Sequence, residues 1–195
     1  MATRVMLKNI VMAFPALAEP QSLGEGEPAY GAKFPITPNS EQQKAIEAAI
    51  LAEATAAWKD KAGSILQLLE EDGKLCFSKK VYKSKRDGEP YAGFAGNHYL
   101  STRNAKTQPT VFDKYGAELT TTGEIERQAF SGSVVNASIE VWAQDNQWGR
   151  RVNCSLRGVM VTGQGDNLGG GGSAPASANE FAGMAQAKID AEDIL

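Results

Sequence analysis

Residues 133–162 read SVVNASIEVWAQDNQWGRRVNCSLRGVMVT, and this stretch carries the clearest structural signal in the chain. Apolar and polar side chains alternate over residues 134–143, a period of two that predicts a β-strand with one buried face. A polar turn at residues 145–149 separates it from a second alternating run at residues 151–157. We therefore predict a long hairpin, with Gly158 marking a bulge in its second strand.

Outward from this hairpin, the chain divides into short strands and helices. Ser40 and Gln43 form a capping box before an amphipathic stripe that ends near Trp58, which predicts a helix. Pro35 predicts that a short strand over residues 32–36 lies at a sheet edge. The other predicted elements are strands at 5–14, 75–83, 91–103 and 110–112, a short helix at 65–71, a charged turn at 84–90, and loops at 15–31 and 113–129. The pattern predicts a mainly β fold with one or two helices.

The two ends of the chain differ in composition. Residues 1–165 contain the predicted strands and helices and are long enough for one core domain. Residues 169–173 are Gly-Gly-Gly-Gly-Ser, which is typical of flexible linkers. We therefore predict that residues 166–195 are a flexible Gly-rich linker and a disordered acidic C-terminal tail. Its last residues include Asp190, Glu192, Asp193, Ile194 and Leu195.

Charge is distributed unevenly along the chain. The whole chain has 20 basic and 23 acidic residues, for a net charge of −3. Residues 74–106 nevertheless carry eight basic and only two acidic side chains, whereas residues 166–195 carry one basic and five acidic ones. A basic segment kept apart from an acidic tail indicates a polyanionic partner.

Motifs for catalysis and metal binding are missing. The single histidine is His98, and neither a Gly-x-Ser-x-Gly elbow nor a Walker A sequence occurs. Cys76 and Cys154 have no second ligand at metal-site spacing, so we expect two core thiols. We expect no enzyme activity, no cofactor and no metal. The sequence also shows no signal peptide and no bilayer-length apolar run, so we expect a cytoplasmic protein, in the host cytoplasm if phage-encoded, with no membrane partner.

The basic residues 79–86 read KKVYKSKR. Five cations in eight residues repel one another unless a polyanion is present, and phosphate contacts give sequence-independent affinity. The alternative is a solvated edge strand, on which lysines block pairing with another chain.

Aromatic residues accompany this basic segment, and single-strand binders stack bases on such rings. In the predicted hairpin, Trp142 shares a polar face with Arg151 and Arg157, which suits a nucleic-acid surface. The alternative is that Trp142 packs under the helix at residues 40–58. Phe94 is expected in the core, Tyr91 and Tyr99 fit either role, and Trp148 lies in a turn where a ligand could reach it.

Four segments together resemble a phage single-stranded DNA-binding family, typified by the phage Enc34 protein and related to the T7-like phage single-stranded DNA-binding proteins. They are FSGSVVNAS at 130–138, VWAQDN at 141–146, LRGVMV at 156–161 and DNLGG at 166–170, and the resemblance covers residues 3–170. It implies an OB-fold barrel that coats exposed single strands cooperatively in phage DNA replication and recombination. It also implies an acidic tail that regulates binding and recruits partners. Ile194 and Leu195 stand where related tails often end in phenylalanine, which weakens the case for aromatic tail docking.

We therefore expect non-sequence-specific binding of single-stranded DNA, with replication proteins as partners of the tail and self-association on DNA through an edge strand. The phosphate contacts are expected from Lys79, Lys80, Lys83, Lys85, Arg86, Arg103, Arg151 and Arg157, and base stacking from Tyr82, Tyr99, Trp142 and Trp148. Two other functions remain open: a virion or assembly protein that makes only protein contacts, and an RNA-binding OB-type module.

Overall fold

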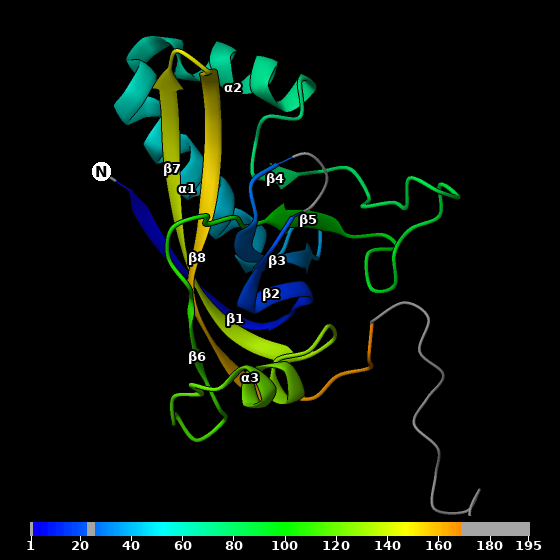
Figure 1. The fold of residues 1–195 in the computed structure, drawn as a ribbon. Coiled ribbons are helices and arrows are strands. Elements are labelled where there is room, and N and C mark those ends of the chain that lie inside the picture. Colours follow the sequence, from blue (N-terminus) through cyan, green and yellow to red (C-terminus); the bar gives the residue numbers. More distant parts are fainter. Residues whose placement is uncertain (1, 23–25, 169–195) are drawn as a thin grey trace, which may run out of the picture.

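The computed structural model describes residues 2–22 and 26–168 (Figure 1). The predicted linker and tail beyond Leu168 lie outside the described residues, as do all five residues named at its tip. The described strands pair into two four-stranded sheets. Sheet A has the order β1 (Thr3–Val11), β7 (Val134–Asn146), β8 (Gly149–Gly163), β6 (Thr110–Phe112), and sheet B the order β2 (Ala13–Gln21), β3 (Ala29–Ile36), β5 (His98–Ser101), β4 (Phe77–Ser78). The mainly β, OB-type fold class is confirmed.

Several connections hold the sheets together. Only Met12 separates β1 from β2, so the chain passes directly from sheet A into sheet B. Farther along, the Arg103 N–H, just after β5, donates to the Cys154 carbonyl of β8 at 2.8 Å. One core fills the space between the sheets, and its most buried side chains include Phe34, Leu100, Ile139 and Leu156.

The predicted hairpin is present as β7 and β8, whose buried positions alternate as the sequence pattern indicated. The register passes from Ser138↔Gly158 to Ile139↔Leu156, so Arg157 is the extra residue of a bulge next to Gly158. That prediction is confirmed. Cys76 and Cys154 are both buried and free, as expected of core thiols.

Three α-helices and a 3₁₀ turn are described: α1 (Glu41–Trp58), η1 (Lys59–Lys61), α2 (Ala62–Glu71) and α3 (Thr122–Gln128). The Ser40 hydroxyl caps α1 by accepting from the Gln43 N–H at 3.2 Å, and the Gln43 carboxamide accepts from the Asn39 N–H at 2.9 Å. Helix α1 packs against β1 and β7, beside the hairpin (Figure 1).

The prediction of a loop over 113–129 was wrong, because α3 lies within it. The missed signal was a second capping box, in which the Thr121 hydroxyl accepts from the Glu124 N–H at 3.4 Å and donates to its carboxylate at 2.7 Å. Seven residues are too few to show a helical apolar period, so only the cap marked this helix.

Several predicted strand bounds were also wrong. Most of the expected loop at 15–31 belongs to β2 and β3, while the strands expected at 75–83 and 91–103 shrink to β4 and β5. Between β4 and β5, residues 79–97 form a long loop instead, with Gly93 and Gly96 at positive φ (Figure 1). Pro35 lies in β3, inside sheet B, but β2 pairs with β3 only as far as Lys33. The proline therefore has a strand partner on one side only, as its missing N–H requires.

Candidate nucleic-acid interface

The outer face of sheet B is set by the pairing of β3 with β5. Phe34 opposite Leu100 faces the core, so the neighbouring pairs Lys33↔Ser101 and Pro35↔Tyr99 face outward. The loop at residues 79–97 lies against this face and adds further rings to Tyr99. The resulting aromatic cluster consists of Phe14, Tyr82, Tyr91, Phe94 and Tyr99.

Tyr82 is the centre of the aromatic cluster. Its ring stacks on Tyr91 with centroids 5.0 Å apart and a 25° interplanar angle, and lies 5.0 Å from the Tyr99 ring at 56°. The Tyr91 N–H donates to the Tyr82 carbonyl at 3.1 Å, which holds the two ends of the loop together. Phe94 is fully buried and supports the cluster from below, as expected of a core ring. The three tyrosines are half-buried.

Lys33 places a cation against these rings. Its Nζ lies 4.5 Å from the Tyr82 centroid and 5.4 Å from the Tyr99 centroid, within cation–π range, and donates to the Ser101 hydroxyl at 2.7 Å. Burial lowers the pKa of Lys33 and is the main reason that the pKa of Tyr82 is raised. Sequence reasoning missed Lys33 because it stands alone in an apolar strand, outside the basic segment.

A second part of the surface lies where sheet B meets the outer face of sheet A. A hollow of about 260 Å³ is lined there by Arg103, Trp142, Arg151 and Lys74, among others. The Trp142 side chain is 36% exposed, and its Nε1–H donates to the Ser155 hydroxyl at 3.3 Å. The tryptophan that joins α1 to the hairpin is instead Trp58, the last residue of the helix, which is buried and whose indole N–H donates to Asp145 at 2.9 Å. The alternative in which Trp142 packs under the helix is therefore wrong.

The two parts are continuous through β5. Ser101 and Arg103 line the hollow beside Trp142, and Ser101 is also the hydrogen-bond partner of Lys33. We call the combined surface the candidate groove, defined by Lys33, Tyr82, Tyr99, Ser101, Arg103, Trp142 and Arg151. It contains five of the twelve nucleic-acid contacts expected from the sequence and two residues that were not expected.

The other expected cations lie around this surface. Lys79 Nζ is 3.4 Å from the Glu47 carboxylate of α1, which turns it away from the groove. Lys80, Lys83, Lys85 and Arg86 are exposed on the 79–97 loop, and Arg86 lies 3.7 Å from Asp87. The loop that positions Tyr82 thus also presents several cations to solvent.

Two further expected residues lie on the hairpin, outside the lining of the Trp142 hollow. Arg157 is 3.3 Å from the Glu140 carboxylate, which also accepts from Arg4 at 3.4 Å. This carboxylate belongs to the same outer face and offsets much of its positive charge. Trp148 is 80% exposed at the hairpin tip.

Other features of the described chain point to structure rather than chemistry. His98 Nδ1 lies 3.2 Å from the Gln43 carboxamide oxygen, and its ring packs edge-on against Phe77. In the part of the chain that the structure describes, no cluster of three or more potential metal ligands occurs, and no helix is long and apolar enough to cross a membrane.

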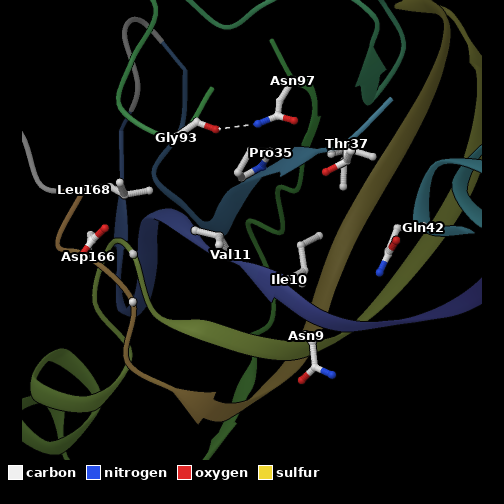
Figure 2. A pocket seen from close by; sticks show the side chains of 13 residues that line it. Asn9, Ile10, Val11, Pro35, Thr37, Gln42, Gly93, Asn97, Asp166 and Leu168 are labelled. Atoms are coloured by element: carbon white, nitrogen blue, oxygen red, sulfur yellow. Dashed lines mark hydrogen bonds between the residues drawn. The ribbon is translucent and has the colours of Figure 1, made fainter. Parts of the chain in front are cut away.

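A hollow of about 420 Å³ lies elsewhere, between β1, the end of β3 and residues 165–168 (Figure 2). Polar amides such as Asn9, Gln42 and Asn97 line it together with apolar side chains, and the Asn97 amide donates to the Gly93 carbonyl at 2.9 Å. It has neither the rings nor the cations of the candidate groove. Leu168 on its rim donates its N–H to the Ser131 carbonyl at 2.9 Å, so residues up to this point contact the core.

Comparisons with known proteins show which proteins the chain resembles. "Putative protein p50" of Acyrthosiphon pisum secondary endosymbiont phage 1 is 35% identical over 192 residues, covering 95% of this chain and 96% of the relative. The fold is similar to a solved structure of the single-stranded DNA-binding protein from bacteriophage Enc34 in complex with ssDNA, with TM-score 0.59 and 20% identity over 85% of this chain and 89% of that one.

It is also similar to gp2.5, a single-stranded DNA-binding protein encoded by bacteriophage T7, with TM-score 0.52 and 12% identity over 96% and 97% of the two chains. At such identities the structural likenesses show the fold. The model of a protein family described as "Enterobacter phage Enc34, ssDNA-binding protein" matches residues 3–195. The chain, with its β core and its surface of rings and cations, therefore belongs to the Enc34 single-stranded DNA-binding protein family.

Proposed function

We propose that the protein binds single-stranded DNA without sequence preference through the candidate groove. The observation that carries the proposal is the arrangement of Lys33 against Tyr82 and Tyr99, continued through Arg103 to Trp142 and Arg151. Rings supply stacking surfaces that accept any base, and the cations follow the phosphate backbone. Family membership supports the same function.

Within this proposal the residues divide into two roles. Tyr82, Tyr99 and Trp142 stack on bases, since all three lie on the groove and none of them is fully buried. Lys33, Arg103 and Arg151 contact phosphates along it, and the 79–97 loop adds Lys80, Lys83, Lys85 and Arg86 at one side. Trp148 and Arg157 extend the contact surface along the hairpin, and Lys79 joins it when a phosphate competes with Glu47.

The proposal also covers the biological setting. The protein acts on exposed single strands in phage DNA replication and recombination, in the cytoplasm of the host. The acidic end of the chain competes with DNA for the basic surface and recruits replication proteins. Self-association on DNA is supported by β1, which pairs with β7 on one side only.

Titration of labelled oligonucleotides by fluorescence anisotropy tests the function. Binding to single strands is expected at micromolar protein or below, with affinity that falls steeply as salt rises. Quenching of tryptophan fluorescence should accompany it, because Trp142 and Trp148 are exposed. Absence of binding at low salt rejects the proposal, and a preference for RNA of the same sequence would favour the RNA-binding alternative.

A further inference from the structure

A third hollow, of about 300 Å³, lies on the outer face of sheet B. Ala16 pairs with Gly31, which is on the same face of β3 as Lys33, and all three line this hollow. Phe14, which belongs to the aromatic cluster, and Tyr30 add apolar wall. The hollow is therefore an apolar recess next to the rings of the candidate groove.

The rim of the recess carries two cations. Arg103 Nη2 donates to the Glu27 carbonyl at 2.6 Å, and Lys33 Nζ donates to the Ser101 hydroxyl. Neither side chain forms a salt bridge with a carboxylate of the described residues. Glu27 is the acidic residue of the lining, and its carboxylate pairs with neither cation. A rim with two unpaired cations around a mostly apolar interior suits a ligand that has an apolar part between two negative charges.

The recess adjoins the proposed path of the DNA, and a nucleotide is a ligand of this kind. Ser101 and Arg103 line both this recess and the hollow beside Trp142, so a strand running from Tyr99 to Trp142 must cross the mouth of the recess. The floor of the recess is closely packed: a Cβ on Gly31 of β3 would lie 2.1 Å from the carbonyl oxygen of Thr102, just after β5, so glycine is needed there. A nucleotide at this crossing has its base opposite the apolar walls and its phosphates opposite Lys33 and Arg103.

We propose that the recess is a nucleobase pocket that takes one base of the bound single strand, while Lys33 and Arg103 hold the phosphates on either side. This inference rests on the proposed function. It adds that one nucleotide of the bound strand always occupies the same place on the protein. A volume near 300 Å³ lies at the small end of ligand sites and fits a single base rather than a larger group.

A cycle of paired changes in DNA and protein tests the pocket. The DNA is a series of oligonucleotides of the shortest length that binds, each with one abasic nucleotide at a different position. The protein is the full chain and its Ala16→Leu variant, in which the added carbons fill the recess. For the wild type, we expect an abasic nucleotide at one position to lower the affinity about tenfold relative to the intact oligonucleotide, the order of one stacked base. For Ala16→Leu, the same abasic position should lower the affinity less than about twofold.

The outcomes separate the two proposals. Binding of the intact oligonucleotide with equal losses at every abasic position, or with the same tenfold loss in Ala16→Leu, overturns the pocket and leaves the proposed function standing. No binding of any oligonucleotide by the wild type overturns both. The matched control is Ala117→Leu, the same change at an exposed position outside the groove, which should behave as wild type.

Photocrosslinking provides a test that does not depend on the folding of a variant. An oligonucleotide with 5-iododeoxyuridine at the sensitive position is irradiated with the wild-type chain, and the crosslinked peptide is identified by mass spectrometry. Attachment to Tyr30 or Phe14 is expected, because both rings line the recess. Attachment only to Tyr82, Tyr99 or Trp142 overturns the pocket, since the base would then lie on the open groove.

Discussion

At the residue scale, Tyr99 combines a fixed position on the groove with a half-buried ring. It lies on β5, paired on both sides, and packs 5.0 Å from Tyr82. Replacing Tyr99 with alanine is expected to weaken single-strand binding about tenfold, the order of one stacked base. Anisotropy titration measures the loss. Tyr115→Ala is the control, because this ring is 83% exposed on a loop outside the groove; an equal loss in both variants would contradict a stacking role for Tyr99.

Lys33 has two proposed roles, because its ammonium group lies against the rings of Tyr82 and Tyr99 and also on the groove. If it contacts a phosphate, Lys33→Met lowers the slope of log affinity against log salt by about 0.7, the value for one contact with a single strand. Lys33→Arg keeps the charge and should keep the slope. Unchanged slopes in both variants would mean that Lys33 only supports the rings.

The lowered pKa of Lys33 also gives a prediction for stability. Burial opposes the charged form in the folded chain, so between the lowered pKa and the ordinary value near 10.5 the unfolded chain binds more protons. Stability then rises with pH in that window. As the pH rises toward 10.5, the wild type should gain unfolding free energy relative to Lys33→Met, as measured by urea denaturation. Parallel pH profiles for the two proteins would contradict this.

At the scale of elements, Glu140 lowers the positive charge of the outer face of the β7–β8 hairpin, because it forms ion pairs with both Arg4 and Arg157. Glu140→Gln removes this contact and releases both guanidinium groups. Exposed ion pairs contribute little to stability, so the fold should persist.

If the DNA path includes Arg157, we expect Glu140→Gln to bind single strands about two- to fivefold more tightly at low salt, with a steeper salt slope. Glu118→Gln makes the same charge change at an exposed site on the loop after β6 and should have no effect. Unchanged affinity in Glu140→Gln would place Arg157 outside the path.

At the scale of the whole molecule, the net charge of −3 conceals a basic surface on the core and an acidic end of the chain. If the acidic end competes for the groove, removing residues 174–195 should tighten single-strand binding, most strongly at low salt where charges are least screened. Neutralising Asp190, Glu192 and Asp193 to amides in the full chain should have a similar effect. Unchanged or weaker binding in both variants would exclude competition.

The sequence by itself determined the elements whose signals are local. The alternation over 134–143 specified β7, Gly158 marked the bulge, and Ser40 with Gln43 fixed the start of α1, because each depends on residues within a few positions of one another. Composition gave the basic segment and with it Tyr82, Tyr99 and Arg103, whereas the alternation of the hairpin gave Trp142 and Arg151; these are the five expected residues of the candidate groove.

Only the tertiary structure decided which of these residues meet. Lys33 lies opposite Ser101 across 68 positions of sequence, and that pairing brings a cation from an apolar strand to Tyr82 and Tyr99. Other long-range contacts set Glu140 against Arg4, across the β1–β7 pair, and Lys79 against Glu47 of α1. Strand register and the packing of one sheet against the other are collective properties of the core, so no local pattern reports them.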